Sequence, residues 1–396
     1  MKKICFVSIL ALLLGVACEK TLPPAPDDSE LLDGPVEGLS HDEQRRFLAG
    51  DVAFNDEVFT EASGLGPLFV STSCGSCHAG DGKGHPFTTL TRFGQVDETG
   101  NQFLHLGGPQ LQHRALPGFT PEQIPVGATF SKILPPANTG LGFLETVTDA
   151  DLLALADPED ADGDGISGRP NWVELPAYST PRPGALSQNG RYIGRFGKKA
   201  AVYDLLQQTA RAYNQDMGIT SFYEPFDTYS GHELDPEVSN QTVQDVVFYL
   251  RTLKAPIPRQ ANAPSTGAGK ILFEQLGCAK CHTPVLRTGP SPIAALAFRE
   301  IQPYTDLLLH DMGTDLDDGY TEGLAKTAEW RTPALWGLGL SKNSQGGQYF
   351  LLHDGRASSI EAAIGLHGGE SSQSRAAFQA LDAAQKNQLI TFLESL

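Results

Sequence analysis

Two copies of the pattern Cys-x-x-Cys-His provide the residues most able to do chemistry. They occupy positions 74–78 and 278–282 and use four of the six cysteines. This pattern is typical of c-type haem attachment, in which two thiols bond to the haem vinyl groups and the adjacent histidine binds the iron. The sequence therefore predicts two covalently bound haem c groups. The predicted attachment residues are Cys74, Cys77, Cys278 and Cys281, and the predicted iron ligands are His78 and His282.

The ligand on the far side of each iron separates an electron carrier from an enzyme. A six-coordinate haem transfers electrons, whereas a five-coordinate haem can bind an oxidant. Met312, which lies 30 residues beyond His282, could ligate the second iron or could simply fill the core. His367 is flanked by small residues and is the other candidate, although a lone histidine also serves at surfaces and in hydrogen bonds. No such candidate stands out for the first iron.

Peroxide chemistry needs a side chain that moves a proton between two oxygen atoms. Glu145 is the first candidate because it is a lone carboxylate in the apolar run 141–147, where burial would raise its pKa. The alternative is a surface or helix-capping carboxylate. His105 and Gln110 are the second candidates.

A second metal site is suggested by alternating acidic residues. Asp160, Asp162 and Asp164 precede Gly165, as in the first half of a calcium-binding loop. Alternate carboxylates converge on a hard cation, and glycine permits the turn. Asn171 takes the place of the final bidentate glutamate. The pattern predicts calcium at these four residues, with an ordinary Asp/Gly-rich turn as the alternative.

The amino-terminus resembles an export signal. Two lysines precede an apolar run over residues 4–17, which is short for a transmembrane helix. The segment 14–18 resembles a bacterial lipoprotein signal in which Cys18 becomes lipidated. Ordinary cleavage just before Cys18 is the alternative, and it would leave a spare thiol. We expect an exported protein on the periplasmic side, anchored to a membrane through lipid only.

The remaining chain divides into segments of different character. Residues 19–40 are rich in Pro, Asp, Glu and Gly and predict a flexible tether. A Pro-rich linker at 255–266 separates a first domain at 41–254 from a second at 267–396. We expect a mainly α fold with two cytochrome c-like haem domains. Residues 85–235 have few convincing long helices and predict loop-rich insertions in the first domain.

An internal repeat supports this division. Each motif follows a short series of aromatic and glycine residues, and each half ends in an apolar helix, at 243–253 and 389–396. The residues matched in the repeat are Phe59, Gly64 and Phe69 in the first copy, and Gly269, Phe273 and Gly277 in the second.

The net charge of −18 disfavours nucleic acid as a partner. An acidic surface would instead attract a basic redox protein. The expected partners are a small redox protein or a quinol-linked electron donor or acceptor, and a small-molecule oxidant or substrate.

Longer motifs carry a resemblance to a known family. Segments similar to the carboxy-terminal half of bacterial di-haem cytochrome c peroxidases, a superfamily that includes the di-haem enzyme that matures methylamine dehydrogenase, are 330–335 (WRTPAL), 349–356 (YFLLHDGR) and 359–364 (SIEAAI). The chain more closely resembles the bacterial di-haem oxidoreductases often labelled thiol oxidoreductases. The segments that carry this likeness are 107–112 (GGPQLQ), 140–145 (GLGFLE), 160–171 (DADGDGISGRPN), 194–197 (GRFG) and 367–370 (HGGE).

The resemblance implies roles for particular residues. His367 occupies the place of the axial methionine of the peroxidases, which favours it over Met312, and Glu145 lies in the region of their distal glutamate. The first half lacks their Trp-Asp-Gly-Arg segment, so the resemblance does not establish peroxidase turnover. It implies an oxidoreductase with one relay haem and one reactive haem. The main alternative is a non-catalytic di-haem electron-transfer protein, whereas dithiol exchange would need cysteines that thioether bonds consume.

Overall fold

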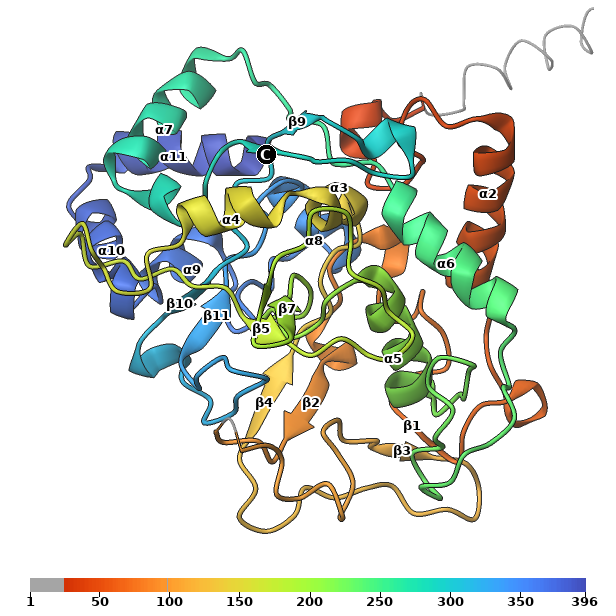
Figure 1. Cartoon of the computed structure of the whole chain (residues 1–396). Coiled ribbons are helices and arrows are strands. Elements are labelled where there is room, and N and C mark those ends of the chain that lie inside the picture. Colours follow the sequence, from red (N-terminus) through yellow and green to blue (C-terminus); the bar gives the residue numbers. More distant parts are fainter. Residues whose placement is uncertain (1–24, 98) are drawn as a thin grey trace, which may run out of the picture.

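The computed structural model describes residues 25–97 and 99–396 (Figure 1). The predicted signal at 1–18, with Cys18, and the start of the predicted tether lie outside these residues. Within the part described, no helix is both long enough and apolar enough to cross a membrane.

Two crossed helix pairs organise the molecule. In the first half, α2 (His41–Asn55) packs on α6 (Asn240–Thr252). In the second half, α7 (Pro264–Gln275) packs on α11 (Ala383–Ser395). Figure 1 shows the two pairs at separate places, with α6 and α11 confirming the apolar helix predicted at the end of each half.

A glycine lies at each helix crossing. A Cβ at Gly50 would overlap the Asp245 carbonyl, and a Cβ at Gly269 would overlap the Gln388 carbonyl. Only glycine lets the backbones approach this closely. The two pairs are therefore structural repeats with equivalent crossings.

The predicted alignment of the repeat is wrong in its first copy. Phe54, four residues after Gly50, has its ring centroid 5.9 Å from that of His78, and Phe273, four residues after Gly269, lies 6.4 Å from His282. The first copy is thus centred on Gly50 and Phe54, not on Phe59, Gly64 and Phe69. The error arose because 19 residues separate Phe54 from the first motif, whereas only four separate Phe273 from the second.

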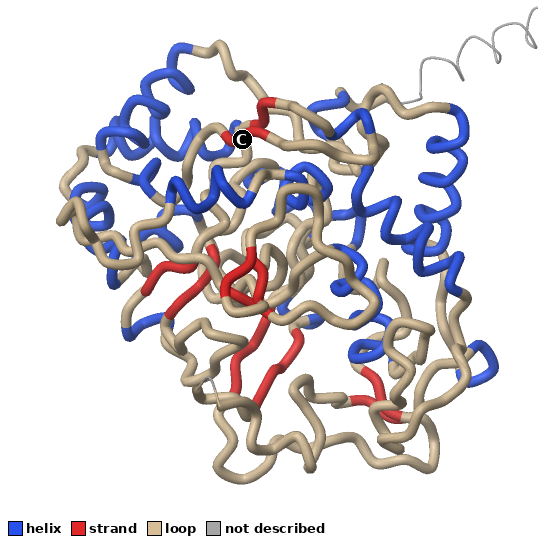
Figure 2. Tube along the Cα trace, in the orientation of Figure 1, coloured by secondary structure: helices blue, strands red, loops and turns tan. Residues whose placement is uncertain are grey.

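Shorter elements and loops fill the rest of the chain, and Figure 2 shows how much of it is loop. The remaining α-helices are α3 (Leu141–Thr146), α4 (Asp149–Leu155), α5 (Leu205–Met217), α8 (Ser341–Ser344), α9 (Ile360–Gly365) and α10 (Ser372–Gln379). The antiparallel two-stranded sheets are β1 (Leu68–Phe69) with β3 (Arg114–Ala115), β2 (Leu90–Phe93) with β4 (Phe130–Ile133), β8 (Leu286–Arg287) with β9 (Glu300–Ile301), and β10 (Leu309–Asp311) with β11 (Glu329–Arg331). A three-stranded sheet has the order β5 (Trp172–Val173), β7 (Arg191–Ile193), β6 (Ser187–Gln188).

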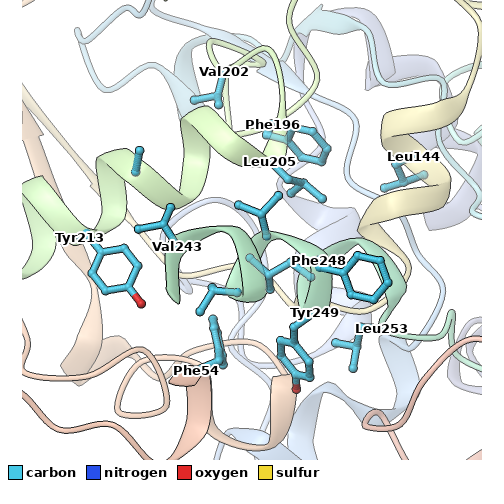
Figure 3. Close-up of a cluster of buried hydrophobic side chains, with 14 of the residues drawn as sticks. Phe54, Leu144, Phe196, Val202, Leu205, Tyr213, Val243, Phe248, Tyr249 and Leu253 are labelled. Carbon is cyan, nitrogen blue, oxygen red and sulfur yellow. The ribbon is translucent and has the colours of Figure 1, made fainter. Parts of the chain in front are cut away.

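Each helix pair has its own hydrophobic core. The larger core surrounds α6, and Figure 3 shows part of it, with Val243 and Tyr249 among the labelled side chains. The smaller core surrounds α11 and includes Phe273, Leu389 and Phe392. The larger core also takes in residues from Leu286 to Leu307, so this segment of the second half packs on the first half.

The predicted tether is packed against the body over its described part. The Val36 amide donates to the Thr252 carbonyl over 2.7 Å, and Lys254 forms an ion pair with Asp28. Leu32 and Leu39 are buried. The expectation of a flexible tether up to residue 40 is therefore wrong over residues 28–39, because two leucines in this polar segment gain stability by burial.

Candidate functional site

Both Cys-x-x-Cys-His motifs line one cavity of about 450 Å³. This volume lies within the ordinary range for cofactor and ligand sites. The structure thus brings all six predicted attachment and ligand residues to one site: Cys74, Cys77, His78, Cys278, Cys281 and His282.

The two motif histidines are oriented as metal ligands. His78 Nδ1 lies 2.9 Å from the Pro136 carbonyl oxygen, and His282 Nδ1 lies 3.0 Å from that of Tyr304. A ring N–H donated to a backbone carbonyl fixes the tautomer and leaves Nε2 free for a metal. Burial lowers the pKa of both imidazoles to about 4, so both are neutral, as ligands must be. The residues present therefore fit haem iron.

The four motif thiols are poor nucleophiles. They form no disulfide, and burial raises the pKa of Cys74 to about 12 and that of Cys278 to about 11. Burial also raises the pKa of Cys77 and Cys281. Because the thiolate is the reactive form, these values disfavour dithiol exchange at neutral pH.

A third imidazole faces the second motif. His367 follows α9 and lines the cavity, and its Nδ1 lies 2.7 Å from the Ala363 carbonyl oxygen, which again leaves Nε2 free. After burial, the charge of His367 is the next largest influence lowering the pKa of His282, so the two rings are close. Met312 also lines the cavity, and its carbonyl packs against Gly368. The structure thus places both candidates at the second motif, and the orientation of His367 suits a ligand.

A buried charged cluster beside Cys281 was missed from the sequence. His310 Nε2 lies 2.8 Å from Asp306, and its Nδ1 lies 2.7 Å from Glu370 and 3.5 Å from Cys281 Sγ. Burial alone would lower the pKa of His310, but these partners raise it to about 12. The imidazolium stays charged at neutral pH. In the sequence, the four-residue spacing between Asp306 and His310 was a signal of this cluster.

The wall near the first motif is polar and comes largely from α5. Asp216 lines the cavity, and burial raises its pKa to about 6. Gln110 donates a short hydrogen bond to Asp216 and accepts one from Arg92 over 3.3 Å. The Asp216 charge also raises the pKa of Cys74 and Cys77, which places it near both thiols. A carboxyl that titrates near neutrality inside a cavity suits proton transfer.

The structure places the three predicted catalytic residues at different sites. Gln110 lines the cavity, whereas His105 is exposed and Glu145 lines a separate pocket. Burial would raise the pKa of Glu145, as expected, but Arg251 outweighs it, and the pKa is lowered. Glu145 accepts from Arg251 Nε over 2.6 Å and from the Leu205 amide over 2.8 Å. The predicted lone acid is therefore an ion-paired carboxylate at the start of α5.

The predicted calcium loop assembles only in part. Carboxylate oxygens of Asp160 and Asp162 converge with those of Asp157, which the sequence pattern did not include. Asp164 instead lies 2.9 Å from Lys280 in the second motif. Asn171 is buried, and its amide donates to two backbone carbonyls and accepts from a third residue. Asn171 is thus a structural residue, because its polar atoms are all used inside the fold.

Comparison with known proteins identifies the family. The family described as "Di-haem oxidoreductase, putative peroxidase" matches residues 132–396, which is more than half of the chain. The chain therefore belongs to the di-haem oxidoreductase family, is an enzyme of this class, and has a relationship to peroxidases, as the sequence motifs predicted. Membership also implies haem as the cofactor.

Two solved structures are similar over most of their length. One is hydrazine synthase from Kuenenia stuttgartiensis, determined under xenon pressure, with 14% identity over 95% of this chain and 96% of that chain and a TM-score of 0.39. The other is a MauG-like protein associated with microbial copper homeostasis, with 14% identity over 95% of this chain and 94% of that chain and a TM-score of 0.40. No curated protein matches the chain.

Proposed function

We propose that the protein is an exported di-haem c-type oxidoreductase with unequal haems. The haem at Cys278 and Cys281 relays electrons, and the haem at Cys74 and Cys77 reacts with peroxide or another small substrate. The observation that carries this proposal is the single cavity with two unlike ends, one holding a third imidazole and the other a polar wall with a titratable carboxyl.

The chain's own residues would manage protons at the reactive end. Reduction of hydrogen peroxide to two waters consumes two electrons and two protons, and bound haem supplies the redox centre. Asp216 would accept a proton from one peroxide oxygen and return it to the other. Gln110 holds the Asp216 carboxyl in place, and Arg92, paired with Glu322, places a positive charge nearby.

The opposite end would serve electron transfer. His282 and His367 would both hold the second iron, and two protein ligands would leave no position for an oxidant. Aliphatic and aromatic side chains around them, including Phe273, Leu389 and Leu393, exclude water. A bis-imidazole site would have a lower potential than one with a thioether ligand.

The architecture proposed for these sites is a pair of cytochrome c-like domains, at 41–254 and 267–396. The repeated helix crossing and the repeated Phe–His contact support it.

The test is to expose the reduced holoprotein to carbon monoxide and the oxidised holoprotein to peroxide. We expect one haem to bind carbon monoxide, and peroxide to react at that haem. If neither haem binds carbon monoxide and peroxide leaves the spectrum unchanged, the protein is an electron carrier. Pyridine haemochrome spectra should show two thioether-linked haems per chain.

Export and anchoring are also proposals. The apolar run before Cys18 supports a lipoprotein signal, and the net charge of −18 supports a basic redox partner. A small redox protein or a quinol-linked system would exchange electrons with the second haem. Cys18→Ala should release the protein from the membrane fraction, and retention of this variant would contradict the lipid anchor.

Calcium remains a proposal for the acidic loop. The converging carboxylates of Asp157, Asp160 and Asp162 support it, and the loop is tied to the second motif through Asp164 and Lys280. A chelator should lower the melting temperature and added calcium should restore it. Melting that is insensitive to chelator would refute the site.

A further inference from the structure

Three basic side chains line the cavity without forming an ion pair among the described residues, although the charge of Asp354 acts on one of them and that of Asp306 on another. They are Lys83, Lys198 and Arg331. In the described part of the chain, none of the three takes part in an ion pair, and neither lysine amino group donates a hydrogen bond. Arg331 donates from Nε to the Gly197 carbonyl over 3.0 Å and from Nη1 to the Thr332 carbonyl over 3.1 Å, which leaves Nη2 for a further partner. The three residues are half-buried in this cavity, and three like charges gathered there without an ion-pair partner point to an anion as the missing ligand.

The three side chains link the two motifs. Lys83 precedes Gly84, which packs against the Cys77 carbonyl, and the charge of Lys198 lowers the pKa of His78. The Arg331 amide donates to the Lys198 carbonyl over 2.9 Å. At the other end, the charge of Asp306 beside the second motif raises the pKa of Arg331. We call Lys83, Lys198 and Arg331 the cation row.

The pKa values of all three side chains in the cation row are lowered. Burial lowers the pKa of Lys83 to about 8, that of Lys198 to about 7 and that of Arg331 to about 10. Lys83 and Arg331 lower the pKa of Lys198 further by repulsion. An anion within the row would reverse these shifts.

The neighbouring Lys199 shows how the fold satisfies a lysine that has a structural role. Its amino group donates to the carbonyls of Lys326, Thr327 and Glu329 over 2.7–3.0 Å, and it lies 3.8 Å from the centre of the Trp330 ring. Lys198 has no such partners, although it is the adjacent residue. The contrast indicates that Lys198 is held for a ligand and not for the fold.

We propose that the cation row binds the carboxylate groups of the bound haems, so that both haems share one set of counter-ions. This inference rests on the proposed covalent attachment of two haems. Each haem carries two carboxylates on the edge opposite the vinyl groups that bond to cysteine. Lysine and arginine are the ordinary partners of carboxylates, and a shared set would couple the two redox potentials.

The test is spectroelectrochemical titration of the holoprotein at pH 6, where wild-type Lys198 is protonated. In Lys198→Met, loss of a positive charge disfavours the reduced haem, so both midpoint potentials should fall. We expect the ferrous-to-ferric ratio at fixed potential to fall about tenfold at each haem, which is about 59 mV for one electron. Lys83→Met should act in the same direction, and Lys198→Arg should restore the wild-type values.

Lys270→Met is the matched control, because Lys270 is an exposed lysine on α7. Potentials in Lys198→Met that equal those of this control would overturn the proposal. An unchanged potential with a raised KM for an anionic oxidant would also overturn it and would assign the row to substrate. Peroxide reactivity is scored separately. A wild-type protein with two haems but no peroxide reaction contradicts the proposed function, while the shift in potential still decides the cation row.

Discussion

The two ends of the cavity share a frame but differ in chemistry. At each end, a crossed helix pair with a glycine at the crossing brings a phenylalanine toward the motif histidine. At the second end, His367 and apolar side chains line the cavity with the motif histidine, and the charged cluster of Asp306, His310 and Glu370 lies beside Cys281. At the first end, Asp216 and Gln110 form a polar wall. The difference is the basis for the proposal that a repeated scaffold separates electron relay at one end from substrate chemistry at the other.

The difference originates in chain length. The second motif follows its helix almost at once, whereas a segment of 18 residues separates α2 from the first motif. The long stretch from β2 to α5 then supplies Arg92, Gln110 and Asp216. Loops around a fixed scaffold are the usual place for reactive groups. The polar wall at the first end therefore comes from this long stretch, whereas the buried charges at the second end are those of Asp306, His310 and Glu370.

The largest expected effect comes from removing the imidazole that distinguishes the second end. His367→Gly should abolish the low-spin signal of one haem, because its iron loses a ligand and becomes five-coordinate. Optical and electron paramagnetic resonance spectra measure this change. His105→Gly, at an exposed histidine, is the control and should leave both spectra unchanged. A low-spin signal that persists in His367→Gly would contradict His367 as a ligand of the second iron and would favour Met312.

The polar wall should affect the rate of the peroxide reaction and not the ligands of the haem iron. Asp216→Asn should slow the peroxide reaction by about 10²- to 10⁴-fold, the usual contribution of a general acid–base group. In the wild type, the rate should fall as pH drops below about 6, because the carboxylate becomes protonated. The variant should lose this dependence. Stopped-flow measurements across pH 5–8 provide the check.

Glu145→Gln is the matched control for Asp216→Asn. Since Glu145 pairs with Arg251 and caps α5, the substitution should lower stability and leave the rate of the folded protein unchanged. A large loss of rate in Glu145→Gln, with none in Asp216→Asn, would reverse the assignment of the proton-transfer group.

The helix crossings that the two ends have in common can be tested at their glycines. Gly50→Ala and Gly269→Ala should each destabilise the protein by about 1–3 kcal/mol, because the new methyl group overlaps a carbonyl of the crossing helix. Gly267→Ala, on α7 with open space around it, should be neutral or stabilising. Thermal and urea unfolding measure these changes. Equal stability of Gly267→Ala and Gly269→Ala would show that the crossing is not tight.

A smaller effect should be confined to the second end. The folded-state pKa of His310 is about 12 and exceeds its unfolded value of about 6.5, so its contribution to stability is complete below pH 6.5 and declines as pH rises toward 12. The stability advantage of the wild type over His310→Gln should therefore shrink from pH 7 to pH 8, by up to about 1.4 kcal/mol. If the stability advantage of the wild type over His310→Gln instead grows with pH, the imidazole of His310 is neutral in the folded protein.

The sequence predicted local patterns better than distant contacts. The haem motifs, the terminal helices of each half and the family were accessible, because each depends on residues close together in the chain. Glu145 was misjudged because Arg251, its partner, lies 106 residues away. The link from His310 to Glu370 spans 60 residues, and no local spacing reveals it. The cation row could not be predicted either, because Lys83 and Lys198 lie in two separate loops and Arg331 lies on β11.

The two haem sites are proposed to be unlike, and the spin state of each iron tests this difference. Electron paramagnetic resonance of the oxidised holoprotein should show one low-spin ferric haem, held by His282 and His367, and one high-spin ferric haem at His78. Peroxide should then change the high-spin signal first. Two low-spin haems that are both inert to peroxide and carbon monoxide would show that the two sites are alike and that the protein is an electron carrier.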